Sequence, residues 1–281
     1  MKKSPFIMGL LLLMFSISSF AIDQQKIASA NVAPPVIEGK SWLLIDNDSG
    51  AVLSAGAPDM QIEPASLTKL MAAYIVFREL AEGRQNLDDM VFVSEKAWRM
   101  EGSRMFIKVN SSVKLEDLVK GMIIQSGNDA TVALAEHVAG TEESFVGLMN
   151  KVAAELGMKQ THYVNSSGMP DEGHLTSATD LAILTRALIN QFPQYYKYYS
   201  IKDFTWNKIK QGNRNILLYR DPSVDGVKTG HTESAGYCLI GSANRDGMRL
   251  IAIVTGTDSK MARADMVQNL FNYGFRNYIT R

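Results

Sequence analysis

The chain has 281 residues, of which 46% are hydrophobic, enough for one large domain with its own core or for two small ones. Lysine plus arginine and aspartate plus glutamate both number 29, so the formal net charge is zero and no basic excess points to a nucleic-acid-binding protein. The single cysteine, Cys238, excludes an internal disulfide, and a buried, inert thiol is expected in its strand-like surroundings.

The N-terminus has the pattern of a secretory signal. Lys2 and Lys3 precede an apolar segment, Phe6 to Phe20, which ends in the small-x-small sequence Ser19-Phe20-Ala21. We therefore expect residues 1–21 to be a signal peptide and the protein to be exported. The alternative, an uncleaved anchor, is disfavoured because the segment is short for a spanning helix and carries a cleavage signal.

The first folded elements are expected after a linker at residues 22–40, which contains two adjacent prolines. Two strands, Ser41 to Ile45 and Ala51 to Ser54, are separated by a polar turn sequence and predict a hairpin. A long apolar run, Leu67 to Leu80, follows Pro64. A proline just before such a run marks the start of a helix.

The middle of the chain, roughly residues 85–190, is mostly helical, with short extended pieces such as Met90 to Val93. Its predicted helices are Leu115 to Ile124, Asp129 to Ala139, Glu143 to Leu156 and Ala178 to Asn190. Strands are then predicted at Asp203 to Trp206, Gly226 to His231, Tyr237 to Ser242 and Arg249 to Thr255, and a last helix at Ser259 to Tyr273. Strands at both chain ends favour an α/β protein of the α+β type. One antiparallel sheet would form from the two ends, flanked by helices, with an all-helical lobe inserted.

Three short segments carry the candidate chemistry: Ser66-Leu67-Thr68-Lys69, Ser126-Gly127-Asn128 and Lys228-Thr229-Gly230. A serine hydroxyl is a weak nucleophile without a base. On a helix the first and last residues of the first segment share a face, so the lysine can act as that base if burial and neighbouring cations suppress its charge. The segments lie on a helix, a loop and a strand, and the predicted fold would bring them to one cleft.

Two further matches to these patterns are expected to be coincidental. Ser111-Ser112-Val113-Lys114 lies in a polar stretch and is predicted to form a turn and the N-cap of the helix that begins near Lys114. Ser242-Ala243-Asn244 runs into Asn244-Arg245-Asp246-Gly247, which is a hairpin turn signal. The Lys-Thr-Gly segment occurs only once.

The four histidines do not form another recognisable site. His137, His162, His174 and His231 are scattered, without the spacing of metal ligands, and no Gly-x-Ser-x-Gly nucleophile elbow is present. His137 is expected to be structural. His162 and His174 are expected near a loop, Tyr163 to Thr176, at the border of the cleft. No metal and no cofactor is implied.

With these motifs the chain resembles the low-molecular-mass penicillin-binding proteins, in their D-alanyl-D-alanine carboxypeptidase branch. The resemblance rests on Ala65-Ser66-Leu67-Thr68-Lys69, Gln125-Ser126-Gly127-Asn128-Asp129-Ala130 and Asp225-Gly226-Val227-Lys228-Thr229-Gly230-His231-Thr232. It implies the serine β-lactamase/transpeptidase fold for residues 41–281 and removal of the terminal D-alanine from peptidoglycan stem pentapeptides. It also implies β-lactam antibiotics as covalent inhibitors, and a location in the periplasm or on the outer face of the cytoplasmic membrane.

The catalytic roles divide among four residues. Ser66 is expected to be the nucleophile and Lys69 its base. Ser126 is expected to relay a proton to the leaving D-alanine amine. Asn128 is expected either to hydrogen-bond the substrate amide or to position Lys69.

The substrate-binding residues are expected around the third motif. Lys228 and Thr229 would hold the substrate's terminal carboxylate through charge-assisted hydrogen bonds. Gly230 would leave room for an extended substrate backbone. The family match implies that the backbone N–H of His231, with that of the nucleophile, forms the oxyanion hole. Arg263 is expected to help bind the carboxylate, although its position also suits a surface residue of the last helix.

Some features of the sequence differ from the family it resembles, and they bear on which other functions remain open. The branch usually continues into an all-β domain and an amphipathic anchor, whereas this sequence ends at Arg281, so we expect no stable membrane anchor after signal cleavage. A β-lactamase would need a deacylating base, yet Glu172 lacks a Glu-x-x-Leu-Asn context. A D,D-endopeptidase stays open, although Gly127 argues against it because that branch more often has glutamate there. A non-catalytic peptidoglycan-binding protein is disfavoured because Ser66 and Lys69 are both present.

Overall fold

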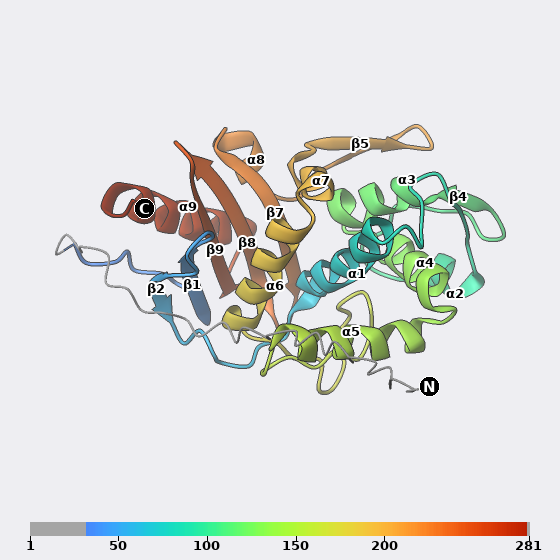
Figure 1. The fold of residues 1–281 in the computed structure, drawn as a ribbon, viewed down its shortest axis with the longest axis horizontal. Coiled ribbons are helices and arrows are strands. Elements are labelled where there is room, and N and C mark those ends of the chain that lie inside the picture. Colours follow the sequence, from blue (N-terminus) through green and yellow to red (C-terminus); the bar gives the residue numbers. More distant parts are fainter. Residues whose placement is uncertain (1–31, 280–281) are drawn as a thin grey trace, which may run out of the picture.

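The computed structural model describes residues 32–279, which form a five-stranded antiparallel sheet with a helical region beside it (Figure 1). The strand order is β2-β1-β9-β8-β7. The strands are β1 Ser41–Asp46, β2 Val52–Gly56, β7 Val224–Thr232, β8 Gly236–Arg245 and β9 Met248–Thr257. β1 pairs with β9 along its length, so the two ends of the chain build one sheet, and the predicted fold class is confirmed.

The predicted signal peptide, residues 1–21, lies outside the described residues, as do residues 22–31 of the predicted linker. The described part of that linker packs on the sheet. Ile37 is buried, and the backbone N–H of Lys40 donates to the carbonyl of Thr255 at 2.8 Å. The chain is therefore anchored to the sheet before β1 begins.

The alternation of side chains along β9 divides the core into two layers. Leu250, Ala252 and Val254 pack against α9, Lys260–Asn277, which covers one face of the sheet. Ile251 and Ile253 belong to a second core on the opposite face, toward α6, Ala178–Gln191. Figure 1 shows α9 and α6 on opposite sides of the sheet, so both faces are covered.

The helical region is built around one buried helix, α1, Lys69–Ala81, of which eleven of 13 residues are buried. A helix that is apolar on all sides belongs in the interior, so the long apolar run of the sequence marks this position. Around α1 lie η1 Ala65–Thr68, α2 Glu95–Arg99, α3 Leu115–Lys120, η2 Gly121–Gln125, α4 Asn128–Ala139 and α5 Glu142–Leu156. This is the inserted helical lobe, with α6 packed between it and the sheet.

Side chains at the predicted helix starts cap several of these helices. Thr141 caps α5, Ser177 caps α6 and Ser259 caps α9, each by accepting a hydrogen bond from the backbone N–H three residues on. Such caps satisfy N–H groups that have no partner within the helix, and each contributes about 1 kcal/mol.

Among the described helices, none combines the length and the hydropathy of a membrane-spanning segment.

Strands contain most of the first coincidental motif match and all of the second. Ser112–Lys114 is β4, which pairs with β3, Met90–Phe92, so the predicted N-cap at this serine pair is wrong. Ser242 to Asn244 lies inside β8, and the predicted hairpin turn follows it. Asp246 and Gly247 both have positive φ angles, 50° and 87°, which is what a tight two-residue hairpin turn requires.

A chain segment between α6 and β7 bridges the sheet and the helical lobe. It contains α7 Pro193–Tyr196, η3 Lys197–Ser200, β5 Asp203–Trp206, β6 Ile209–Gly212 and α8 Leu217–Arg220. β5 and β6 form a hairpin that extends over the helical lobe (Figure 1). The side-chain amide of Gln211 on β6 donates to the carbonyl of Met105 at 3.0 Å, which ties the hairpin to the lobe.

Candidate active site

Ser66 and Lys69 lie on a 3₁₀ turn that continues into α1. In this geometry, residues three apart lie directly above one another. The Nζ atom of Lys69 is 3.0 Å from the Oγ atom of Ser66. Ser66 is partly exposed, whereas Lys69 is only 1% exposed. The prediction that the two side chains share a face is therefore confirmed, with the nucleophile candidate open to a ligand and its partner enclosed.

The environment of Lys69 suits a base. Its Nζ atom also contacts the Oδ1 atom of Asn128 at 2.7 Å and the carbonyl oxygen of Ser167. Burial, followed by the positive charge of Arg214, lowers the pKa of Lys69 to about 7, against the opposing effect of Asp129. Because an ordinary lysine keeps its proton until pH 10, this amine is the rare lysine that can accept a proton near neutral pH.

The second motif sits at a break between two helices. η2 is one turn of π-helix, a feature that occurs often at functional sites, and Ser126 follows it in the left-handed conformation, with φ 65° and ψ 33°. That conformation costs a residue with a side chain roughly 1–3 kcal/mol. The Oγ atom of Ser126 accepts a hydrogen bond from the Nζ atom of Lys228 at 2.8 Å. The sequence predicts the helix but not its π-helical end.

A buried carboxylate fixes the loop beside this motif. The two side-chain oxygens of Asp129 accept hydrogen bonds from the backbone N–H groups of Met105, Phe106 and Ile107, at 2.8, 2.8 and 3.2 Å. Gly127 is confined by the same contact. A Cβ atom there would lie 2.9 Å from Asp129 Oδ1 and 3.0 Å from the nitrogen of Met105. A larger residue at position 127 would therefore displace this loop.

The third motif lies on β7, which packs against the Ser66 turn. Lys228 is 2% exposed and donates to Ser126 and to the carbonyl of Thr229. Burial, followed by the charges of Lys69, Arg214 and Arg263, lowers the pKa of Lys228 well below its usual value. With two buried amines under each other's influence, the site does not readily hold both protons near neutral pH.

Gly230 has a packing reason to be glycine. A Cβ atom there would lie 3.0 Å from the carbonyl oxygen of Pro64 and 3.2 Å from the side chain of Leu67. The missing side chain thus lets β7 approach the Ser66 turn closely. The expected role of Gly230, room for substrate, is not what this contact provides, and a substrate contact at this residue stays a prediction, as it does for the buried Thr229.

Arg214 is a cation of the site that the sequence analysis missed. It lies in the short connection between β6 and α8, and its charge lowers the pKa of both Lys69 and Lys228. Its neighbours fix the connection: the side-chain amide of Asn213 donates to the carbonyl of Ile201 at 3.0 Å, and that of Asn215 to the carbonyl of Gly226 at 2.9 Å. Arg214 itself is exposed. A lone arginine in a polar loop gives no sequence signal.

His231 and Arg263 lie at the end of β7. The ring of His231 is exposed and stacks on Tyr237 at 3.9 Å between ring centres. Arg263 is 5% exposed, and its Nη1 atom donates to the carbonyls of Gly230 and Cys238 at 2.9 and 3.2 Å. These bonds brace the strand pair that carries the third motif. A direct contact of Arg263 with substrate stays a prediction.

Cys238 is buried as predicted, and His137 lies within a helix as predicted. Cys238 is fully buried, and burial raises the pKa of its thiol, which makes the group unreactive. His137 lies on α4 and contacts the side-chain oxygen of Gln85 at 2.7 Å, so it has a structural partner. Within residues 32–279, no group of three or more histidine, cysteine or carboxylate side chains is arranged to hold a metal ion.

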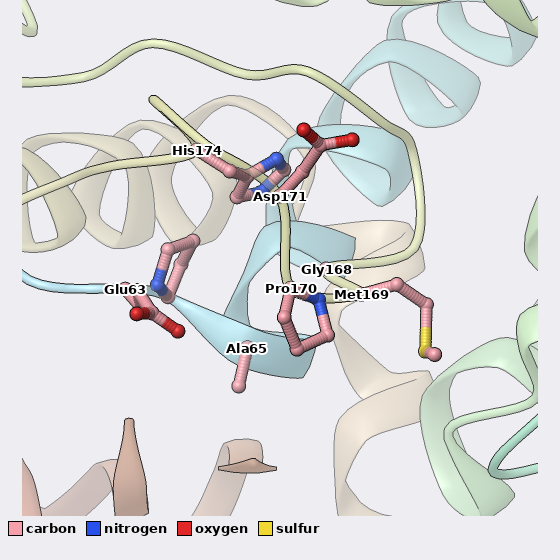
Figure 2. A pocket seen from close by; sticks show the side chains of 8 residues that line it. Glu63, Ala65, Gly168, Met169, Pro170, Asp171 and His174 are labelled. Carbon is pink, nitrogen blue, oxygen red and sulfur yellow. The ribbon is translucent and has the colours of Figure 1, made fainter. Parts of the chain in front are cut away.

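The loop between α5 and α6 borders the Ser66 turn, as expected. A small pocket lies between them, lined on one side by Glu63, Pro64 and Ala65 and on the other by Gly168, Met169, Pro170, Asp171 and His174 (Figure 2). Gly168 has a φ of +85°, and a Cβ atom there would lie 1.8 Å from the carbonyl oxygen of Ala65. Only glycine fits this contact. Glu172 is exposed and does not line the pocket.

Comparisons with known proteins agree with this geometry. A family model described as D-alanyl-D-alanine carboxypeptidase matches residues 28–259. The D-alanyl-D-alanine carboxypeptidase DacA of Haemophilus influenzae is 42% identical over 270 residues, which are 94% of this chain and 68% of that protein.

Solved structures lead to the same family. Penicillin binding protein 5 from Haemophilus influenzae has a TM-score of 0.85 and 44% identity, covering 87% of this chain and 73% of that one. Penicillin-Binding Protein D2 from Listeria monocytogenes, solved in an ampicillin-bound form, has a TM-score of 0.79 and 29% identity, covering 86% and 100%. The chain therefore belongs to the D-alanyl-D-alanine carboxypeptidase family of serine hydrolases.

Proposed function

We propose that this enzyme removes the terminal D-alanine from peptidoglycan stem pentapeptides through an acyl-enzyme on Ser66. The observation that carries the proposal is the pair formed by Ser66 and Lys69. The hydroxyl is partly exposed, the amine is buried 3.0 Å away, and the pKa of that amine is lowered to about 7. A nucleophile and a base within hydrogen-bond reach are the minimum that acyl transfer requires.

The acylation step follows from these contacts. Lys69 Nζ takes the hydroxyl proton while Ser66 Oγ forms a bond to the carbonyl carbon of the penultimate D-alanine. The amide C–N bond then breaks, and the leaving amine of the terminal D-alanine takes a proton from Lys69 or from the hydroxyl of Ser126. Ser126 can be reprotonated by Lys228, which lies 2.8 Å away. Water later attacks the ester, releases the shortened peptide and restores the Ser66 hydroxyl.

The positive charges of the site favour a substrate with a free carboxylate. Lys228 lies on β7, Arg263 on α9 and Arg214 in the connection between β6 and α8, and Lys228 and Arg263 are buried. A carboxylate placed among them would make charge-assisted hydrogen bonds, which are roughly twice as strong as neutral ones. It would also raise the lowered pKa of Lys228. This preference supports cleavage at a chain end, where the carboxylate of D-alanine is free.

Acylation by β-lactams is part of the same proposal, since a β-lactam also presents an amide and a carboxylate. The Listeria relative solved in an ampicillin-bound form supports it. We expect the penicilloyl ester to persist for minutes or longer, because the sequence lacks the Glu-x-x-Leu-Asn element and Glu172 is exposed outside the pocket.

The test is to incubate the protein separately with a stem pentapeptide and with a cross-linked muropeptide, and to identify the products by mass spectrometry. Release of one D-alanine from the pentapeptide is expected, and Ser66→Ala should abolish it together with the single penicillin adduct. Cleavage of the cross-link alone would instead make the protein a D,D-endopeptidase. An adduct that persists in Ser66→Ala would reject the nucleophile.

We also infer that the protein is exported to the periplasm. The signal-peptide pattern of residues 1–21 supports this, as does the substrate, which lies outside the cytoplasm. Fractionation of expressing cells, with N-terminal sequencing of the recovered protein, tests it. A protein that keeps Met1 and stays with the cytoplasmic fraction would contradict the inference.

A further inference from the structure

His174 is a buried histidine that directly contacts the turn carrying Ser66 and Lys69. His174 is only 2% exposed, and its Nε2 atom lies 2.8 Å from the Oγ1 atom of Thr68. Thr68 stands between the nucleophile candidate and its base. The ring therefore links the loop between α5 and α6 to the first turn of the catalytic helix.

The partners of the ring define its protonation state. Its Nδ1 atom accepts hydrogen bonds from the backbone N–H groups of Val164 and Asn165, at 3.0 and 3.4 Å. A nitrogen that accepts N–H bonds carries no proton, so the neutral ring is protonated at Nε2 and donates to Thr68. A doubly protonated ring would direct an N–H group at two other N–H groups. Docking of the loop thus requires an uncharged ring.

The loop that His174 holds is the one that touches Lys69. Asn165, whose N–H group contacts the ring, accepts bonds through Oδ1 from the N–H groups of Gly168 and Met169, at 2.8 and 3.2 Å. The carbonyl oxygen of Ser167, in the same loop, accepts a hydrogen bond from the Nζ atom of Lys69. A short, fixed path therefore leads from His174 through this loop to Lys69.

We propose that His174 is a positioning residue for acyl transfer: its uncharged ring holds the 164–169 loop on the Ser66 turn and keeps Lys69 enclosed beside the nucleophile. The inference rests on the proposed function, because it presumes that Lys69 is the base. His174 touches neither reacting atom. Its effect on catalysis passes through the burial of the amine and the place of the Ser167 carbonyl.

The charged surroundings of the ring are mixed. Asp171 and Glu63 lie on the pocket side and favour protonation, whereas His162 and Lys69 oppose it (Figure 2). Burial is the largest influence and lowers the pKa of His174 to about 4. The ring of Tyr163 packs edge-on at 5.8 Å between ring centres and adds an apolar wall. The ring is thus uncharged at neutral pH, which is the state that loop docking requires.

The first experiment compares two substitutions of His174 in the full-length enzyme. His174→Gln keeps an acceptor and a donor on one side chain, whereas His174→Leu keeps only the bulk. The readout is the rate of acylation by a fluorescent penicillin as a function of pH. For His174→Leu we expect the rate to fall by about 10- to 100-fold, the scale of a small misplacement of catalytic groups. The midpoint of the pH profile should move upward from about 7, because burial is the main cause of the low pKa of Lys69.

Recovery of the acylation rate in His174→Gln distinguishes a positioning role of His174 from a role in packing alone. His174→Gln should restore the rate to within about threefold and return the midpoint to its original place. Thr68→Val removes the acceptor of the Nε2–H group from the other side and should reproduce the upward shift, which decides the question if His174→Leu does not fold. His137→Leu is the matched control, since it removes a histidine hydrogen bond elsewhere on the same domain.

The outcomes are distinct. A folded His174→Leu or Thr68→Val variant with an unchanged pH midpoint would overturn the inference, whether or not its rate falls. So would a His174→Gln variant as impaired as His174→Leu. Retention of the adduct in Ser66→Ala would instead overturn the proposed function. Loss of the adduct in Ser66→Ala with normal His174 variants would leave the function standing and reject only the positioning role.

Discussion

The Nζ atom of Lys228 lies 2.8 Å from the Oγ atom of Ser126, although the lysine belongs to the sheet and the serine to the helical lobe. The contact between Lys69 and Asn128, at 2.7 Å, links the central helix to the start of α4. The site therefore combines contacts within the helical lobe with one contact, between Lys228 and Ser126, that joins this lobe to the sheet. Both lysines are buried there, and burial is the largest cause of the lowered pKa of each.

The first prediction concerns the pH dependence of acylation. The pKa of Lys69 is lowered to about 7, so the fraction of unprotonated amine rises through neutral pH. The acylation rate should increase about tenfold per pH unit below this value and level off above it. Stopped-flow measurement with a fluorescent penicillin gives the profile. A rate independent of pH across this range would mean that Lys69 is not the base.

A second prediction distinguishes a base from a passive cation at the same position. Lys69→Arg keeps the positive charge, but a guanidinium does not give up its proton in proteins. Acylation should fall by roughly two or more orders of magnitude, the usual contribution of a general base. Circular dichroism establishes that the variant is folded. Near-normal acylation by the folded variant would reject the role.

The architecture could be predicted from the sequence because its signals are local. The apolar run of α1, the nearly continuous apolar run of β9 and the Asp246-Gly247 turn each report the environment of their own residues. β6 and α8 could not be predicted this way, since Ile209–Gly212 is largely polar and its pairing with β5 depends on a tertiary position over the lobe.

The residues of the site likewise fall into those that the sequence motifs identify and those that they do not. Ser66, Lys69, Ser126 and Lys228 are brought together as the motifs predicted, because side-chain chemistry was enough to single them out. The groups that tune them were missed. Arg214 acts through its charge across space, and Ser167 acts through a backbone carbonyl that any residue would provide. No pattern of residue types marks either of these.

A third prediction tests how the negative charge of Asp129 affects the pKa of Lys69. Its charge raises the pKa of Lys69, against burial and Arg214. Asp129→Asn should therefore move the midpoint of the acylation profile below about 7. The same change turns an N–H group toward the N–H groups of the neighbouring loop, and should lower the free energy of unfolding by about 1–3 kcal/mol. Denaturant unfolding and the pH profile measure the two effects. Asp265→Asn, at an exposed ion pair, is the control, and an upward shift of the midpoint in Asp129→Asn would contradict the assignment.

The fourth prediction follows from the lowered pKa of His174. An unfolded histidine takes up a proton near pH 6.5, whereas His174 does so only near pH 4. Between these values the unfolded state binds the extra proton, so the stability contributed by the neutral ring is present above pH 6.5 and is lost as pH falls toward 4. The free energy of unfolding should decline by about 1.4 kcal/mol per pH unit relative to His174→Gln. Parallel stability curves for the two proteins would show that the ring is protonated in the folded state.

The last prediction uses two glycines of one loop that both have a positive φ angle. Gly168 and Gly173 have φ angles of +85° and +79°, so an alanine at either position is strained by its positive φ, by roughly 1 kcal/mol. They differ in their surroundings. A Cβ atom at Gly168 would overlap the carbonyl of Ala65, whereas one at Gly173 would meet nothing within 4 Å. Gly173→Ala should therefore show only the strain and acylate normally. Gly168→Ala should push the loop off the Ser66 turn, expose Lys69 and slow acylation by about 10-fold or more, the scale of a displaced catalytic group. Thermal unfolding and acylation by penicillin, measured on both variants, separate strain from displacement. Equal effects of the two substitutions on acylation would mean that the contact between Gly168 and Ala65 does not hold the site together.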